Sequence, residues 1–249
     1  MTGAPSGPLR MHRHPLRMFF SAGSWAAMAY LASYIPIGTV MFGVAVTVVV
    51  TSYALSIIWL GLPLLVGAAW IVRGCAQVER KRGLLVADQV PDSYRPVTKP
   101  GLFAQIKTRW TDPATLRDCA YLILMYPLLL VLDTVALAIW LSFLGGLALP
   151  LWYWSIPRTW DNGVSDHGVM IGYLPNGPHG DGGFGVWIGD LPTALIAAAV
   201  FFLLSLLAAY LIVAAARLHR TVARSLLGPR VDPLAAAKRM LAAPGPLIP

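Results

Sequence analysis

Charged side chains are scarce in this sequence, and one long stretch has none at all. Lys, Arg, Asp and Glu together make up 12% of the residues, and no charged residue or histidine occurs from Met18 to Val72. A helix rises about 1.5 Å per residue and a bilayer core is about 30 Å thick, so one crossing takes about 20 residues. The uncharged stretch is therefore long enough for two crossings and a turn, which excludes a soluble globular protein. We expect a multi-pass protein of the plasma membrane.

Cysteines and catalytic motifs are also few. The two cysteines, Cys75 and Cys119, lie at the ends of apolar runs, without the spacing of a disulfide framework or a metal site. No Ser-His-Asp set, nucleotide-binding loop, HExxH motif or catalytic carboxylate pair can be assembled on one side of a membrane. We therefore expect a protein that is not an enzyme and holds no cofactor and no metal. The net charge of +8 is divided among the segments between apolar runs, which does not indicate nucleic-acid binding.

The basic residues predict how the chain crosses the membrane. Three Lys or Arg residues precede Met18, nine lie between Arg73 and Arg117, six follow Ala216, and the one that remains is Arg158. With four crossings, 18 of these 19 residues fall on one side of the membrane, whereas three or five crossings scatter them over both sides. By the positive-inside rule this side is the cytoplasm, which then holds both termini and the loop after the second crossing.

The predicted fold class is an all-α membrane protein with four transmembrane helices. We expect a basic cytoplasmic N-terminus (residues 1–17), a four-span membrane domain (18–230) and a Pro-rich cytoplasmic tail (231–249). The spans are placed at about residues 20–49, 53–77, 119–146 and 191–216, with a cytoplasmic loop at 78–118 and an extracytoplasmic loop at 150–190.

The two halves of the membrane domain share a sequence pattern. The matching segments are residues 29–31 with Pro36 and 60–63 in the first half, and 120–122 with Pro127 and 147–150 in the second. Each half holds two spans, so we expect a parallel repeat. The pattern leaves the start of the second span open. If 60–63 marks the outer end, the span begins near residue 60 and Arg73 lies inside the bilayer. If the span begins near Tyr53, Arg73 lies at the cytoplasmic interface. The uncharged stretch favours the second start.

Residues 102–110 have apolar side chains at helical spacing, with basic residues between them. This pattern predicts an amphipathic helix, which either lies on the membrane surface or packs on the cytoplasmic end of the helix bundle. Thr111-Asp112-Pro113 then predicts the N-terminal cap of the helix that leads into the third span.

Several short segments together resemble a known family. They are residues 61–65, 73–74 with 79–82, 112–118 with 120–122, 149–154, and 217–220 with 226–229. In order and spacing they resemble the sensor domain family of actinobacteria, over about residues 22–230. That domain often forms the N-terminal membrane part of two-component histidine kinases and also occurs alone. The resemblance implies a membrane sensor for signal transduction. Only 20 residues follow Pro229, without a phosphoacceptor histidine or an ATP-binding segment, so we expect a sensor that stands alone and signals through a partner.

Asp133 is the one acidic residue inside a predicted span. A carboxylate at the middle of a bilayer costs about 2.5–3.5 kcal/mol on insertion scales, so we expect it to face the bundle interior and to have a partner. Arg73 is one candidate, and the hydroxyls of Thr39, Thr47 and Tyr53 are others. Asp133 either acts as a switch that responds to a proton or a ligand, or makes an interhelical hydrogen bond that holds the bundle together.

The loop at 150–190 is rich in aromatic, acidic and glycine residues, which predicts an ordered loop or a small cap rather than a helix. Aromatic rings beside acids suit a cationic or amphipathic ligand. An aromatic collar at the membrane surface is the alternative. His167, His179 and Asp181 lack the spacing of a metal site. Together with Asp133, the candidate ligand-binding residues are Trp152, Tyr153, Trp154, Trp160, Asp161, Asp166, His167 and Trp187.

The cytoplasmic segments supply candidate partner-binding residues. These are Arg80, Lys81, Arg82, Lys107, Arg109, Arg217, Arg220 and Arg224. They attract anionic lipids of the bilayer or dock a protein partner, namely a kinase, a response regulator or a membrane complex. A homo-oligomer is a further arrangement that the sequence leaves open.

Three functions fit these observations. The first is a sensor or regulatory protein that relays an envelope or lipid signal to a separate partner. The second is a small transporter, or an accessory subunit of a transport complex, that uses the repeat interface and Asp133. The third is a structural subunit of a membrane complex.

Overall fold

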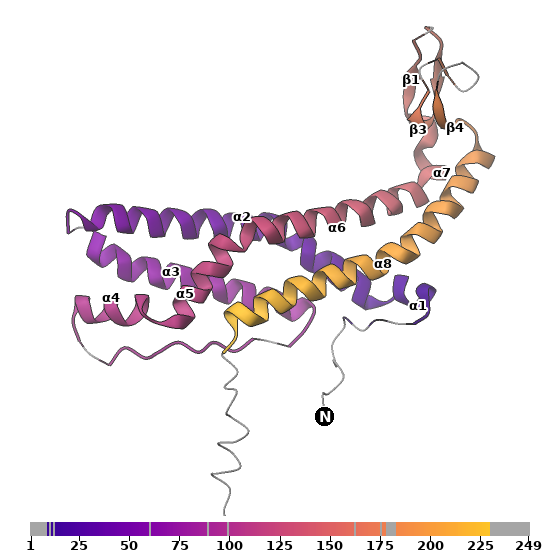
Figure 1. Ribbon diagram of the computed structural model, residues 1–249. Coiled ribbons are helices and arrows are strands. Elements are labelled where there is room, and N and C mark those ends of the chain that lie inside the picture. The colour runs from indigo at the N-terminus through magenta and orange to yellow at the C-terminus, as the bar shows by residue number, and fades with distance from the viewer. Residues whose placement is uncertain are drawn as a thin grey trace, which may run out of the picture. The chain divides into compact units, whose positions relative to one another are not determined.

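The computed structural model (Figure 1) describes residues 9, 11, 13–59, 61–88, 90–98, 100–161, 163–174, 176–177 and 183–229. Among these residues, four helices are long and apolar enough to cross a membrane, which confirms the prediction of four such helices. They are α2 (Ala22–Ser56), α3 (Gly61–Arg82), α6 (Tyr126–Leu147) and α8 (Leu191–Leu227). Their orientation and the parallel repeat stay predictions. Most of the N-terminal segment, all of the tail at 231–249, His179 and Asp181 lie outside the described residues.

The first helix is longer than the predicted first span. Helix α2 continues to Ser56, and α3 begins at Gly61, so the turn comes later than the sequence analysis placed it. A Cβ atom on Gly61 would lie 2.1 Å from the backbone nitrogen of Ser56, so only glycine lets α3 begin this close to the end of α2. The second of the two expected starts, near Tyr53, is therefore wrong, and Arg73 lies twelve residues, or about 18 Å, into α3.

The remaining elements are short. They are α1 (Pro15–Phe19), η1 (Gly83–Leu85), α4 (Leu102–Trp110), α5 (Pro113–Cys119), η2 (Ala120–Leu124), α7 (Leu149–Trp152), η3 (Tyr153–Ser155), β1 (Pro157–Thr159), β2 (Ser165–His167), β3 (Val169–Tyr173) and β4 (Phe184–Ile188). Contacts divide the described chain into two compact units. Unit 1 comprises the described residues within 1–35, 85–87 and 130–217, and unit 2 comprises those within 36–84, 88–129 and 218–229.

Unit 1 has a core of aromatic and small side chains. Trp140 of α6 is fully buried, and its ring lies 5.6 Å from the ring of Phe19 and 6.1 Å from the ring of Trp25. Helix α8 contributes alanines, among them Ala209 and Ala216. Small residues let helices approach closely, and this close packing holds apolar helices together where lipid offers no hydrophobic driving force.

The segment at 150–190 folds into two antiparallel hairpins, β1 with β2 and β3 with β4. The expectation of an all-α protein is therefore corrected for this segment, while the long helices are as predicted. In the second hairpin Gly172 faces Gly185. Gly172 has a φ of 110°, and a Cβ atom on it would lie 2.5 Å from the carbonyl oxygen of Phe184. The glycines that argued against helix thus permit the close pairing of the strands.

Unit 2 holds the amphipathic helix α4, which packs on α3. The indole Nε1 of Trp110 donates a hydrogen bond to the carbonyl oxygen of Leu65 at 3.0 Å, and the guanidinium of Arg109 lies 4.5 Å from the ring centre of Trp70. Helix α4 thus packs near the start of α3, while both expected arrangements, on the membrane surface or on the cytoplasmic end of the bundle, stay predictions. The predicted cap is also present, since the Asp112 carboxylate accepts a hydrogen bond from the backbone nitrogen of Ala114.

Candidate functional site

Charged side chains gather in the interior of unit 2. We call them, with the tyrosines that they contact, the ionic cluster: Arg73, Glu79, Arg80, Arg82, Tyr94, Asp112, Asp118, Tyr121 and His219. Elements α3, α5 and α8 supply most of them. A buried charge is costly unless it is paired and hydrogen-bonded, so the position of each partner matters.

Arg73 of α3 pairs with Asp112 at the start of α5. Its Nη2 lies 3.0 Å from Asp112 Oδ2, and both its Nε and its Nη2 donate to the hydroxyl of Thr115. The ring of Tyr94 lies 4.3 Å from the guanidinium carbon. Arg73 was one of several candidate partners for Asp133, and the carboxylate that it pairs with is that of Asp112 instead.

Arg80, one helical heptad further along α3, pairs with Asp118 of α5. The two side chains are each 1% exposed, and Arg80 Nη2 lies 3.1 Å from Asp118 Oδ1. Tyr94 bridges them, since its hydroxyl accepts from Arg80 Nη1 at 2.8 Å and donates to Asp118 Oδ2 at 2.5 Å. Burial raises the pKa of Asp118 to about 6, against the lowering effect of Tyr94 and Arg80.

Glu79 and Arg82, three residues apart on α3, form a bidentate pair with distances of 2.7 and 2.8 Å. His219 of α8 joins them, because its Nε2 lies 3.1 Å from Arg82 Nη2 and 3.0 Å from the hydroxyl of Tyr121. A guanidinium can only donate, so His219 Nε2 accepts this hydrogen bond and the neutral ring carries its proton on Nδ1.

Arginines also bind the C-terminal end of α8. Arg80 Nη2 donates to the carbonyl oxygen of Leu227 at 2.9 Å, and Arg117 Nη1 donates to that of Gly228 at 2.9 Å. These carbonyls have no partner within the helix, and the cations complement the negative end of the helix dipole. The ionic cluster thus ties the end of α8 to α3 and α5.

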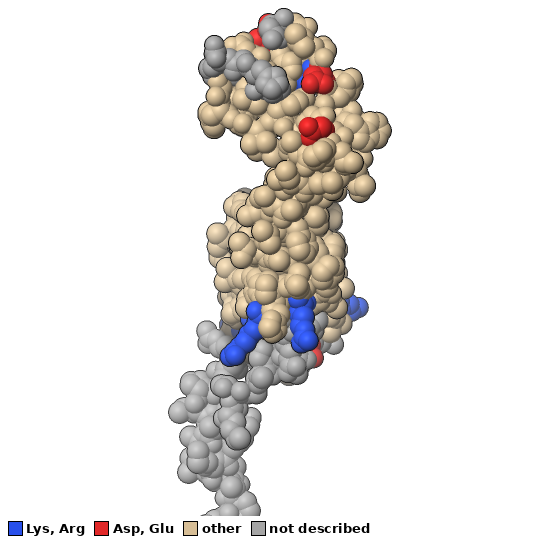
Figure 2. Space-filling model, turned by 90° about the vertical axis from the view of Figure 1, so that its right-hand side faces the viewer, with Lys and Arg blue, Asp and Glu red and all other residues tan. Residues whose placement is uncertain are grey.

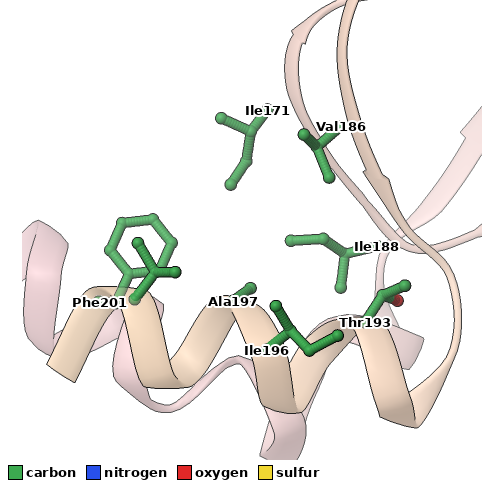
Figure 3. A pocket seen from close by; sticks show the side chains of 8 residues that line it. Ile171, Val186, Ile188, Thr193, Ile196, Ala197 and Phe201 are labelled. Atoms are coloured by element: carbon green, nitrogen blue, oxygen red, sulfur yellow. The ribbon is translucent and has the colours of Figure 1, made fainter. Parts of the chain in front are cut away.

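Unit 1 contains an apolar pocket of about 350 Å³, which we call the hairpin pocket. It is lined by Ile171, Val186, Ile188, Thr193, Ile196, Ala197, Val200 and Phe201. Figure 3 shows side chains of the β3–β4 hairpin on one side and of α8 on the other. Ile171 and Val186 are cross-strand partners, and Ile188 lies two residues further along β4, so all three share one face of the hairpin.

Helix α8 begins at the rim of this pocket. The Asp190 carboxylate accepts hydrogen bonds from the backbone nitrogen of Thr193 at 2.8 Å and from its hydroxyl at 2.5 Å. These bonds hold the pKa of Asp190 below its usual value, so this exposed carboxylate is charged at neutral pH. At the other end of the pocket, the Phe201 ring packs on Gly146 of α6, where a Cβ atom would lie 2.3 Å from the ring.

The residues predicted to bind a ligand do not line the pocket. Asp133 is fully buried in α6. Trp160 is buried and lies 4.9 Å from the ring of Trp187. Trp152 and Trp154 donate to backbone carbonyl oxygens of Gly145 and Leu151, and Tyr153 is half-buried, whereas Asp161, Asp166 and His167 are exposed. Their predicted role in binding stays a prediction.

The residues predicted to bind a partner divide into two groups. Four of them are buried inside the protein, namely Arg80, Arg82, Arg109 and Arg220. Lys81, Lys107 and Arg224 are exposed, and Arg217 is half-buried with its Nε donating to the carbonyl oxygen of Leu9 at 2.9 Å. A partner can therefore reach the second group more readily than the first.

Sequence reasoning missed most of the ionic cluster, including Glu79, Asp118 and His219. A signal was present in the spacing along α3. Arg73 and Arg80 are seven residues apart and Glu79 and Arg82 three apart, which places each pair on one face of a helix. Charged residues on a shared face of an apolar helix need buried partners.

Comparisons with known proteins bear on this arrangement. A family model described as "Putative sensor" matches residues 30–227, a range that includes both the ionic cluster and the hairpin pocket. No curated protein and no solved structure was found to match the chain.

Proposed function

Because the chain belongs to the Putative sensor family, we propose that it is a plasma-membrane sensor that detects an envelope or lipid signal at the hairpin pocket and relays it to a cytoplasmic partner. In this proposal the pocket lies on the extracytoplasmic side and the ionic cluster on the cytoplasmic side. The distribution of basic residues supports this orientation, because the segment at 150–190 holds Arg158 alone of the 19 Lys and Arg residues.

One observation carries the proposal: a single helix, α8, takes part in both sites. Five residues between Thr193 and Phe201 line the hairpin pocket, His219 belongs to the ionic cluster, and the Leu227 carbonyl accepts a hydrogen bond from the cluster. Along the helix, Phe201 and His219 are 18 residues apart, which corresponds to about 27 Å. A helical stretch of this length is close to the thickness of a bilayer core, about 30 Å, and in this proposal α8 transmits a shift from one surface to the other.

The relay needs an element with two arrangements at the receiving end. In the ionic cluster, arginines of α3 and α5 hold the last carbonyls of α8, and His219 accepts from Arg82. Hydrogen bonds of this kind depend on distance and direction, so a small displacement of α8 breaks some of them and changes the surface around them. The exposed basic residues Lys81, Lys107 and Arg224 are suited to a partner with acidic side chains.

A test of the relay needs no ligand. Ala197→Phe fills the hairpin pocket and imitates an occupant, while Leu195→Phe adds a comparable ring on the same helix at an exposed position that does not line the pocket. The readout is the alkylation rate of Cys119, which follows Asp118 of the cluster, in a Cys75→Ser background. We expect the rate to change severalfold in Ala197→Phe and to stay constant in Leu195→Phe. Equal rates in both variants, with each protein folded, would contradict the proposal.

A transporter is the second candidate, and the burial of Asp133 favours it, because carboxylates inside membrane helices often serve ion pathways. Flux of protons and small cations into vesicles, compared between the wild type and Asp133→Asn, separates the two functions. A sensor gives no flux in either protein.

A further inference from the structure

We propose that the hairpin pocket binds the alkyl chain of a single-chain amphiphile with a cationic head group, and that this molecule is the signal. This inference rests on the function proposed above and specifies its ligand. The lining of the pocket, its size and the charge at its rim each indicate this class of ligand.

The lining calls for a hydrocarbon. Seven of the eight lining residues have side chains of carbon and hydrogen only. The eighth, Thr193, directs its hydroxyl to the Asp190 carboxylate at 2.5 Å. A polar ligand group in this pocket would lose its bonds to water and gain none, whereas an alkyl chain gains about 0.8 kcal/mol for each buried methylene.

The size calls for one chain. A volume of about 350 Å³ lies near the lower end of the range for small-molecule sites, about 300–1,000 Å³. Along α8 the lining extends from Thr193 to Phe201, eight residues or about 12 Å. Such a space suits one chain and is too small for the two chains of a phospholipid. The pocket is also open, since Ile196 is 67% exposed and Val186 is 58% exposed.

The charge at the rim favours a cation. Asp190 is exposed and is held by Thr193, the first residue of α8 that lines the pocket. The segment at 150–190 contains four aspartates and one arginine, so it is acidic while the chain as a whole is basic. In the face shown in Figure 2, acidic side chains lie at the upper end with a basic side chain beside one of them, and the surface directly below them carries no charge. A head group at this boundary meets the Asp190 carboxylate, while its chain meets apolar side chains.

Photo-crosslinking tests the site. The probe is dodecyltrimethylammonium with a diazirine near the end of its chain, added below its micelle-forming concentration to the full chain in phosphatidylcholine vesicles. We expect crosslinks on β3, β4 and residues 193–201 that unlabelled dodecyltrimethylammonium displaces. Ala197→Phe should reduce them at least tenfold, and Leu195→Phe should leave them unchanged. Ile171→Ala with Val186→Ala, which trims the hairpin without filling the pocket, should weaken displacement severalfold and guards against misfolding of the first variant.

The head group is tested by an isosteric change. Asparagine caps a helix as well as aspartate does, so Asp190→Asn keeps the start of α8 and removes the charge. We expect the affinity for dodecyltrimethylammonium to fall about two- to fivefold, the range of an exposed ion pair, and the affinity for neutral dodecanol to stay the same. Equal effects on both compounds, or tighter binding of dodecyl sulfate than of the ammonium compound, would overturn the cationic head group.

The outcomes separate this inference from the proposed function. Crosslinks that are spread over all lipid-facing helices, or a pocket that prefers a two-chain ammonium lipid, contradict the inference. If the probe labels the pocket but leaves Cys119 alkylation unchanged, the ligand assignment stands and the relay fails. If Cys119 responds to pocket filling while the probe labels other sites, the relay stands and this ligand is wrong.

Discussion

Replacement of Arg80 by methionine tests whether the ionic cluster is part of the folded core. The sequence alone placed Arg80 on a partner-binding surface, whereas the structure buries it with hydrogen bonds to Tyr94, Asp118 and Leu227. Methionine fits the apolar path of the arginine stem but leaves the Asp118 carboxylate without its cation. Removal of one partner from a buried ion pair costs about 3–5 kcal/mol.

This cost predicts a measurable loss of thermal stability. For a chain of this size, 1 kcal/mol corresponds to about 2–4 °C in Tm, so Arg80→Met should lower the Tm of the purified protein by about 6–20 °C. The assay is thermal unfolding in detergent, followed by circular dichroism. The matched control is Lys81→Met, because Lys81 is the next residue and is exposed. We expect the control to stay within about 0.5 kcal/mol of the wild type.

A double variant separates pairing from packing. Arg80→Met with Asp118→Leu removes both charges, and such replacements of buried pairs are often neutral or stabilising. We expect it to recover most of the lost Tm. The reasoning is refuted if Arg80→Met is as stable as Lys81→Met, or if the double variant is less stable than Arg80→Met.

Three further predictions concern other parts of the molecule. A Cβ atom on Gly146 would overlap the Phe201 ring, whereas one on Gly145 meets nothing within 4 Å. In thermal unfolding, Gly146→Ala should therefore destabilise the protein by about 1–3 kcal/mol, and Gly145→Ala should stabilise it by up to about 1 kcal/mol. Equal effects of the two changes would be evidence against this packing. Burial raises the pKa of Asp118 to about 6, above its unfolded value of about 3.9. Its contribution to stability is therefore fully present below about pH 4 and is lost as the pH rises through about 6. The Tm difference between the wild type and Asp118→Asn should shrink over this window, and a constant difference would contradict the pKa shift. Burial and the Asp118 charge raise the pKa of Cys119 to about 11. Because the thiolate is the reactive form, iodoacetamide at pH 7.4 should alkylate Cys119 about two orders of magnitude more slowly in the folded protein than in denaturant. Equal rates would contradict this pKa.

The long helices were predictable because long stretches of the sequence lack charged residues. Long stretches with few or no Lys, Arg, Asp or Glu residues mark the helices that can cross a membrane, and the Asp112 cap follows from a local rule. The turn after Ser56 was not predictable in the same way. Residues 20–72 are uncharged throughout, and the contact that places the turn is the close approach of Gly61 to the end of α2.

The hairpins were missed although a signal existed. Alternate positions of 169–173 and of 184–188 are β-branched or aromatic, with Trp187 as an additional aromatic residue, and a segment rich in Gly and Pro separates the two. This is the pattern of a hairpin with a long loop. The abundance of glycine favoured an irregular loop instead, because the pairing of Gly172 with Gly185 depends on the register of the two strands.

The two sites lie beyond local sequence patterns. The pairing of Arg80 with Asp118 joins residues 38 positions apart, and that of Arg82 with His219 joins residues 137 positions apart. The hairpin pocket has no charged or catalytic side chain to mark it, and its lining residues are the same types that face lipid elsewhere. Only the packing of β3 and β4 beside α8 distinguishes the residues that line the pocket from those that face lipid.

The central claim is that α8 carries a signal across the membrane, from the hairpin pocket outside to the ionic cluster inside. Its most direct test is the labelling of Ser93→Cys and Ser165→Cys, two near-isosteric changes at exposed positions, by a membrane-impermeant maleimide in a background without native cysteines. In intact cells we expect Cys at position 165 to react at once and Cys at position 93 to react only after permeabilisation. Reaction at 93 in intact cells, with 165 protected, would place the hairpins inside and contradict the account.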